Sequence, residues 1–297
     1  MPGDRSPSLP AFPAEAFDRL LPLAFAEDVG EGDVTTLATI GESVRGRAVL
    51  LCKQAGVIAG LPALERVFRY RGTAADIRLR AEEGSRVEAG TVAATLQGPL
   101  RELLTCERIL LNFLQRSSGI ATAVRAFADA LEGSGTRLLD TRKTPPGYRA
   151  LDKYAVAAGG GANHRMGLYD MVLVKDNHAE ACGSVRAAVD KARALYGARF
   201  PIEAEVRTLA ELESLLDAPV DIVLLDNMGD DLLREAVRLV RARAPRIKLE
   251  ASGNMDLERA GRIRDFGLDF VSVGALTHSV RALDISLDIE AGSPSRD

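Results

Sequence analysis

The second half of the chain repeats one design, in which a short apolar run ends in a polar residue or glycine and an amphipathic segment follows. Six runs occur from residue 137 onward: RLLDTRK, MVLVKDN, PIEAEV, DIVLLDN, IKLEASG and DFVSVG. The segments between most of them, such as GDDLLREAVRLVRARA, have helical apolar spacing. Continuous apolar strands alternating with helices specify a parallel sheet covered by helices. We therefore predict an α/β barrel.

Polar residues or glycine follow each predicted strand of this barrel. One polar strand end is ordinary, because every strand must stop somewhere, but six in succession indicate a site. In α/β barrels the chemistry collects at the carboxyl ends of the strands. The residues at these ends are Asp140, Lys175, Glu205, Asp226, Ser252 and Gly274.

The first half of the chain has a different pattern. Residues 45–100 form short β-rich runs, which predict a structural sandwich; EEGSRVEAGTVAATLQG resembles a lipoyl-type module but has no lysine at its turn. Residues 14–26, interrupted by Pro22, predict a short or kinked helix, and residues 101–130 predict helical structure with a break at Gly119. With 297 residues, the chain is long enough for two domains.

Composition excludes several classes of protein. Apolar residues make up 46% and charged residues 27%, too apolar for a disordered chain, and a net charge of −4 gives no basic field for nucleic acid. No apolar run reaches the roughly 18 residues that span a bilayer. Three widely spaced cysteines predict neither zinc nor disulfides and fit a reducing cytoplasm. The proline-rich start and the tail GSPSRD are expected to be unstructured, with no signal peptide.

Basic residues concentrate in segment 140–170 of this otherwise acidic protein. Arginine pairs with carboxylates in a bidentate manner and lysine supplies a compact charge for phosphate, so the cluster predicts an anion site. Arg149 and Lys153 are four residues apart on a predicted helix and are expected to be surface or ion-pair residues. The cluster contains Arg142, Lys143, Arg149, Lys153, His164 and Arg165.

The other strand ends suggest complementary roles. Lys175 could be a strand end, an anion ligand or a Schiff-base nucleophile. Glu205 and Asp226 could hold Mg²⁺ or accept hydrogen bonds from ribose, whereas Glu203 and Asp221 are expected to be peripheral.

Small residues at the last two strand ends expose backbone N–H groups and predict a phosphate site. These are Ser252 with Gly253, and Gly274. His178 and His278 are expected to cap helices or to support the site indirectly. Pattern alone gives Arg108 no distinct role.

Taken together, five strings resemble the quinolinate phosphoribosyltransferase family (carboxylating nicotinate-nucleotide pyrophosphorylase). They are ERILLNFLQRSSGIAT, LDTRKTPPGYRALDKYAV, GGGANHRMGLYDMVLVKDNH, LLDNM and LEASGN, and the matches extend from residue 27 to residue 290. The resemblance implies transfer of phosphoribose from phosphoribosyl pyrophosphate (PRPP) to quinolinate, with loss of CO₂, to give nicotinate mononucleotide. Pro145 and Asn254 depart from the family pattern without removing a charge.

The same resemblance implies the fold and the assembly. It implies an N-terminal α/β sandwich over residues 1–116, to which 282–297 returns, and an incomplete seven-stranded barrel of the type II phosphoribosyltransferase kind over 117–281. It also implies a homodimer in which Arg108 completes the neighbouring subunit's site.

The resemblance further assigns the site residues. Arg142, Lys143, His164, Arg165 and Lys175 would bind quinolinate. Glu205 and Asp226 would lie near ribose and Mg²⁺, and Ser252, Gly253 and Gly274 near the 5′-phosphate; the catalytic groups would be Lys143, Lys175, Glu205 and Asp226. Two alternatives remain open: a related paralogue linked to molybdenum uptake, and a lyase using Lys175.

Overall fold

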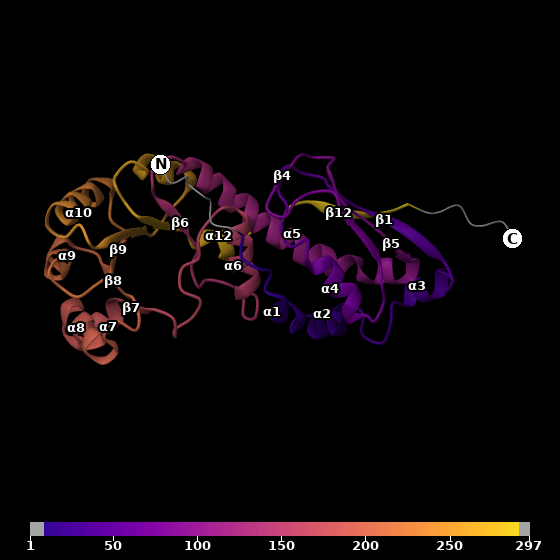
Figure 1. Ribbon diagram of the computed structural model, residues 1–297, viewed down its shortest axis with the longest axis horizontal. Helices are drawn as coiled ribbons and strands as arrows, with labels where there is room; N and C mark the ends of the chain where they lie inside the picture. Colours follow the sequence, from indigo (N-terminus) through magenta and orange to yellow (C-terminus); the bar gives the residue numbers. More distant parts are fainter. Residues whose placement is uncertain (1–8, 291–297) are drawn as a thin grey trace. The chain divides into compact units, whose positions relative to one another are not determined.

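The computed structural model describes residues 9–290, and the chain forms two compact units (Figure 1). The first contains the chain through Arg125, Thr144–Gly160 and the segment from Thr277 onward; the second contains Ala126–Lys143 and Gly161–Leu276. The sequence-based division assigned Thr144–Gly160 to the barrel, whereas it belongs to the first unit. The predictions for residues 1–8 and for the tail GSPSRD lie outside the described residues.

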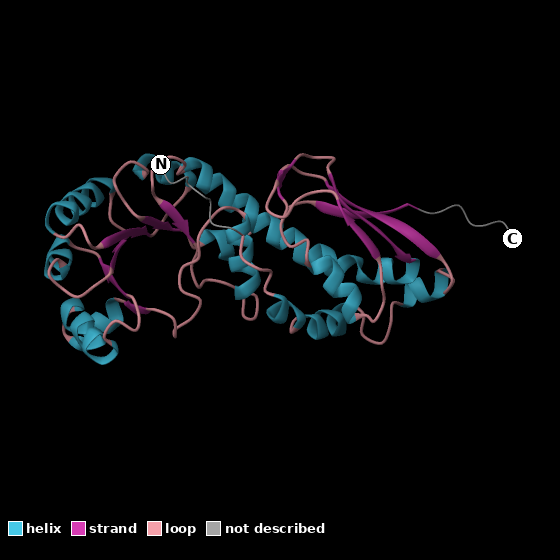
Figure 2. Cartoon of the chain, in the orientation of Figure 1, coloured by secondary structure: helices cyan, strands magenta, loops and turns pink. Residues whose placement is uncertain are grey.

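The first unit is built on an antiparallel sheet with strand order β12-β1-β5-β3. Inward-facing side chains of the sheet, such as Leu50 and Leu96, share one core with Leu103, Cys106 and Leu110 of helix α5. A second, two-stranded sheet pairs β2 with β4 (Figure 2). The elements are α1 (Ala14–Asp18), α2 (Leu21–Asp28), α3 (Val34–Thr39), β1 (Arg45–Cys52), β2 (Gly56–Val57), α4 (Ala63–Tyr70), β3 (Asp76–Leu79), β4 (Arg86–Val87), β5 (Val92–Pro99), α5 (Leu100–Ala130), α6 (Arg149–Ala158) and β12 (Ile285–Glu290).

Two helix predictions have different outcomes. The predicted interruption of the first helix is confirmed as two short helices: α1 ends at Asp18 and α2 begins at Leu21, with Pro22 in its first turn. The predicted break at Gly119 is wrong, because α5 is continuous from Leu100 to Ala130. A Cβ atom at Gly119 would lie 2.2 Å from the carbonyl oxygen of Arg281, so the glycine permits close backbone approach within an intact helix.

Lys153 also departs from expectation. It was expected at the surface or in an ion pair, and the surface alternative is wrong, because only 1% of the residue is exposed in α6. The prediction failed because its four-residue spacing from Arg149 places both residues on one helix face without saying which face is covered.

The second unit is a parallel sheet with strand order β6-β11-β10-β9-β8-β7 (Figure 1). Helix α10 shows why the pattern folds in this way, since Leu233, Ala236, Val237 and Val240 recur at helical spacing and are all buried. The elements are β6 (Arg137–Leu139), β7 (Val172–Val174), α7 (Asp176–Cys182), α8 (Val185–Tyr196), β8 (Ile202–Val206), α9 (Leu209–Leu215), β9 (Ile222–Asp226), α10 (Asp230–Arg243), β10 (Lys248–Ser252), α11 (Leu257–Ile263), β11 (Phe270–Ser272) and α12 (Ala275–His278).

The α/β class is confirmed, and the described parallel sheet has six strands. In place of the seventh strand that the family resemblance implied, there is a single isolated parallel bridge. The bridge joins Leu139 to Ala162, a residue between β6 and β7 in the chain. Within the described residues, no helix is long and apolar enough to cross a membrane.

Candidate active site

The carboxyl ends of the parallel strands surround a cavity of about 210 Å³ in the second unit. Parallel strands bring such ends to one edge of a sheet, so residues far apart in sequence converge there. Eight residues predicted for the site line it: Arg142, Lys143, His164, Arg165, Lys175, Glu205, Asp226 and Ser252. The remaining lining residues are Thr141, Leu173, Leu224, Glu250 and Ser272.

Two arginines form the cationic part of the cavity. Burial and the neighbouring charge of Arg142 lower the pKa of Arg165, and the carboxylates of Glu203 and Asp170 oppose this effect. The Arg165 guanidinium also donates through Nη1 to the carbonyl oxygen of Met171, at 3.1 Å. A pair of close guanidinium groups suits a ligand with more than one carboxylate.

Two carboxylates from adjacent strands form the acidic part. Glu205 is the last residue but one of β8 and Asp226 ends β9. Burial, followed by the charge of Asp226, raises the pKa of Glu205. The guanidinium of Arg207 bridges them: Nη2 lies 3.3 Å from Glu205 Oε1 and Nε lies 3.2 Å from Asp226 Oδ2. The same Nη2 lies 3.1 Å from Asp176 Oδ2. The oxygens of Glu205 and Asp226 are thus arranged to share one cation.

A capping box fixes the backbone of Arg207. Thr208 caps α9, where its Oγ1 accepts from the Glu211 backbone N–H at 3.2 Å and Glu211 Oε2 accepts from the Thr208 backbone N–H at 3.1 Å. The same Oε2 accepts from the Arg207 backbone N–H at 2.8 Å. The start of α9 therefore holds Arg207 beside the acidic pair.

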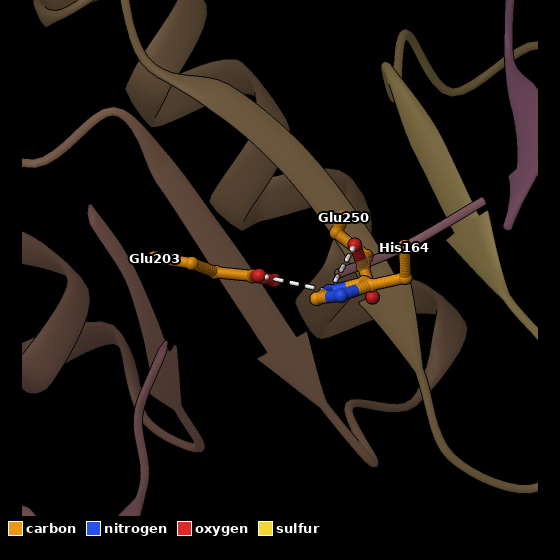
Figure 3. Close-up of side chains that lie close together, drawn as sticks. All are labelled: His164, Glu203 and Glu250. Carbon is orange, nitrogen blue, oxygen red and sulfur yellow. Dashed lines mark ion pairs between the residues drawn. The ribbon is translucent and has the colours of Figure 1, made fainter. Parts of the chain in front are cut away.

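His164 lies against two buried glutamates at the base of the cavity (Figure 3). Its Nε2 is 2.9 Å from Glu203 Oε2 and 3.6 Å from Glu250 Oε2. Glu203 is wholly buried and Glu250 is 1% exposed. Burial, followed by the charge of Glu203, raises the pKa of Glu250 to about 8, which favours the protonated form of Glu250 at neutral pH.

The peripheral placement predicted for Glu203 is therefore wrong. Side chains two apart on a strand share a face, so Glu203 lies one layer below Glu205, and Glu250 one layer below Ser252. That spacing could have identified both glutamates. Asp221 does lie at the opposite end of the strands, where its carboxylate pairs with Arg193 at 2.6 Å.

The turn after β10 has the backbone that an anion site requires. Gly253 has φ +95°, and a Cβ there would lie 2.1 Å from Asn227 Oδ1. Asn254 adopts φ +47° and donates through Nδ2 to the same Oδ1 at 3.2 Å. Asparagine tolerates this left-handed conformation, so Asn254 can replace the family's glycine.

The remaining predicted residues do not line the cavity. Gly253 and Gly274 lie in the backbone turns after β10 and β11, and Arg108 is exposed on α5 in the first unit. The prediction that His178 caps a helix is confirmed, because its Nδ1 accepts from the Lys175 backbone N–H at 3.0 Å at the start of α7. Arg207, which sequence reasoning missed, had no signal beyond its position after a strand end.

Comparisons with known proteins agree with this architecture. Residues 33–118 match the N-terminal domain and residues 120–288 the C-terminal domain of "Quinolinate phosphoribosyl transferase". A probable nicotinate-nucleotide pyrophosphorylase [carboxylating] from Synechocystis is 44% identical over 264 residues, covering 89% of each chain. Its counterpart from Bacillus subtilis is 40% identical over 277 residues, covering 93% of this chain and 94% of its own.

Solved structures give the same result. NadC from Streptococcus pyogenes superposes with a TM-score of 0.89 at 38% identity, covering 98% of this chain and 100% of its own. The nicotinate-nucleotide pyrophosphorylase from Francisella tularensis has a TM-score of 0.88 at 35% identity, covering 96% and 100%. On this agreement of sequence and structure, the chain belongs to the quinolinate phosphoribosyltransferase family.

Proposed function

We propose that the cavity at the strand ends is the active site in which this chain, as a quinolinate phosphoribosyltransferase, joins quinolinate to PRPP. The products are nicotinate mononucleotide, pyrophosphate and CO₂, so the reaction belongs to NAD biosynthesis. One observation carries the assignment: a single cavity contains both the pair Arg142 and Arg165 and the carboxylate pair Glu205 and Asp226.

The arginine pair is assigned to quinolinate. This substrate has two adjacent carboxylates, and Arg142 and Arg165 offer two planar forks that can bind them. Lys143 and Lys175 add positive charge, and Lys175 is exposed, as expected of a charged anion ligand. His164 lines the same cavity and completes the predicted pocket.

The acidic pair and the glycine turns are assigned to PRPP. Glu205 and Asp226 would hold Mg²⁺, directly or through water. They fit a divalent ion because one oxygen of each carboxylate already contacts the same guanidinium, that of Arg207. When bound, the ion would neutralise charge on the leaving pyrophosphate. Ser252, Gly253 and Gly274 are assigned to the 5′-phosphate, since turns of small residues present backbone N–H groups.

The chemistry follows from this placement. The pocket aligns the ring nitrogen of quinolinate with the C1 carbon of the ribose, which lowers the entropic part of the barrier. The nitrogen attacks C1 as pyrophosphate leaves, with Lys143 and Lys175 stabilising the departing charge. The positive charge of the resulting pyridinium then stabilises the carbanion left at C2 when the 2-carboxylate departs as CO₂, and uptake of a proton at C2 completes nicotinate mononucleotide.

The assembly proposed is a homodimer in which Arg108 completes the neighbouring subunit's site. It is supported by the exposure of Arg108 and by its absence from the residues that line the cavity of its own chain. A cytoplasmic location, without nucleic-acid or membrane partners, is supported by the free cysteines Cys52, Cys106 and Cys182 and by the net charge of −4.

The lyase alternative is less well supported. A Schiff-base lysine is commonly desolvated in an apolar pocket, whereas Lys175 is exposed at the start of α7. The molybdenum-linked paralogue would not be expected to require both a dicarboxylate pocket and PRPP.

One assay tests the function directly. The purified chain is incubated with PRPP, Mg²⁺ and carboxyl-labelled quinolinate, and both CO₂ and nicotinate mononucleotide are measured. We expect both products with quinolinate and none when nicotinate replaces it. Absence of CO₂ release at any Mg²⁺ concentration would refute the assignment, and borohydride trapping of a carbonyl substrate on Lys175 would favour the lyase.

A further inference from the structure

We propose that Glu203 is a positioning residue of the quinolinate pocket, whose buried carboxylate fixes the tautomer of His164 and, through that ring, the backbone of Arg165. This inference rests on the proposed function, because it takes Arg165 as a ligand of a substrate carboxylate. Glu203 itself does not line the cavity, so it would act only through its neighbours.

Both imidazole nitrogens of His164 are engaged by the protein. The backbone N–H of Arg165 donates to Nδ1 at 2.7 Å, so Nδ1 must be an unprotonated acceptor. Nε2 therefore carries the ring proton, and Glu203 Oε2 is the closer of the two glutamate oxygens to it, 2.9 Å from Nε2. Together these contacts specify a neutral imidazole protonated on Nε2.

Of the two buried glutamates, Glu203 is the closer to this proton and has the stronger electrostatic attraction for it. Glu250 Oε2 lies farther away, 3.6 Å from Nε2 (Figure 3). Glu250 is therefore a matched comparison: an equally buried glutamate that faces the same ring nitrogen from a greater distance.

The fixed ring determines the position of Arg165. The backbone N–H of His164 donates to Asp140 Oδ1 at 2.8 Å, and the next N–H, of Arg165, donates to the imidazole. Two successive peptide groups are thus fixed: the first by Asp140, directly after β6, and the second by the imidazole that Glu203 of β8 contacts. A guanidinium on a fixed peptide loses less freedom when it binds a carboxylate.

Glu203 has a second effect through its charge. Arg142 and Arg165 repel each other, and the negative charge of Glu203 favours the charged form of Arg165. The two effects can be separated by substitution. Glu203→Gln keeps an oxygen acceptor for Nε2–H but removes the charge, whereas Glu203→Leu removes both with little change in volume.

The test combines imidazole NMR with kinetics. The chain has three histidines, so ¹⁵N-histidine labelling gives few signals, and His164→Gln identifies those of His164. In the wild type we expect a protonated Nε2 and an unprotonated Nδ1. In Glu203→Leu the two nitrogens should move toward a tautomer mixture, and the KM for quinolinate should rise roughly tenfold, as for other groups that orient a histidine.

The controls test whether the effect of Glu203 on the quinolinate KM acts through His164 and Arg165. The KM for PRPP should change less than twofold in Glu203→Leu, and Glu203→Gln should keep the wild-type tautomer with a smaller rise in the quinolinate KM. Glu250→Gln should leave the His164 tautomer unchanged. Glu203→Met gives the same comparison if the leucine variant does not fold.

Three outcomes would overturn the proposal: a wild-type imidazole protonated on Nδ1, a leucine variant with wild-type nitrogen signals, or an unchanged quinolinate KM in that variant. The first is read without any substitution or substrate. A wild-type chain that releases no CO₂ would instead refute the proposed function and leave the tautomer measurement intact.

Discussion

The guanidinium Nε of Arg207 lies 3.2 Å from Asp226 Oδ2, while Nη2 of the same side chain lies 3.3 Å from Glu205 Oε1. Arg207 therefore contacts the two carboxylates assigned to Mg²⁺. Its side chain is 55% exposed, so the contacts are accessible to solvent and individually weak. A metal ion bound by the same oxygens would compete with this guanidinium.

Removing Arg207 should strengthen Mg²⁺ binding. We expect Arg207→Gln to lower the Mg²⁺ concentration for half-maximal activity by a few-fold, because the acidic pair loses its competing cation. The Mg²⁺-dependent rise in melting temperature should begin at a correspondingly lower concentration. Arg262→Gln is the matched control, since Arg262 is 50% exposed and pairs with Asp230 and Glu258 outside the cavity. A raised PRPP KM with unchanged Mg²⁺ dependence would instead indicate that Arg207 binds PRPP.

Truncating Arg142 should impair use of quinolinate. Arg142→Ala removes one of the two guanidinium groups that bind the substrate carboxylates. It should therefore reduce kcat/KM for quinolinate about 100-fold, which corresponds to roughly 2.7 kcal/mol of transition-state stabilisation. Steady-state rates at saturating PRPP measure this. Near-normal rates in Arg142→Ala would remove Arg142 from the pocket.

Mixed dimers test whether sites are shared. Arg108→Ala and Lys175→Ala subunits should each be inactive alone, and co-refolded or co-expressed mixtures should recover activity in the one site per heterodimer that retains both residues. Heterodimers are verified with two affinity tags before the assay. Verified heterodimers without recovered activity would contradict completion of the site by the neighbour's Arg108.

The buried Glu250 should make stability depend on pH. Its folded pKa is about 8, above the ordinary 4.5, so between these values the folded protein keeps a proton that the unfolded chain has lost. Stability from this group is thus present below pH 4.5 and declines as pH rises to about 8. The groups that interact with the Glu250 carboxyl are Glu203, His164 and Ser272.

The measurement compares wild type with Glu250→Gln, which cannot ionise. We expect the wild-type melting temperature to fall more steeply than that of the variant between pH 5 and pH 8.5. Parallel curves would show that Glu250 is not protonated in the folded state.

Two helical glycines should respond oppositely to alanine. Gly119→Ala should destabilise the chain by about 1–3 kcal/mol, because its Cβ would meet the Arg281 carbonyl oxygen at 2.2 Å. Gly261→Ala in α11 meets no atom within 4 Å and should stabilise by about 0.4–1 kcal/mol. Urea unfolding measures both, and equal stability of the two variants would contradict the packing role of Gly119.

The sequence by itself determined the parallel α/β unit and eight of the residues that line its cavity. Apolar runs with polar ends specify buried strands, and parallel strands bring those ends to one edge, so Arg142, Lys175 and Asp226 could be grouped without coordinates. Identification of the substrates came from the family's motifs and from relatives about 40% identical, not from periodicity.

Only the tertiary structure decided what each buried or close-packed residue touches. Local sequence predicted a helix break at Gly119 and a surface position or an ion pair for Lys153, whereas packing made the first a point of contact and buried the second. Glu203 was recognisable as a strand residue, but its role depends on His164, 39 positions earlier in the chain. The periodicity of apolar residues indicates which face of a helix or strand a side chain occupies. It does not indicate which distant segment packs against that face, because this depends on how the strands and helices assemble.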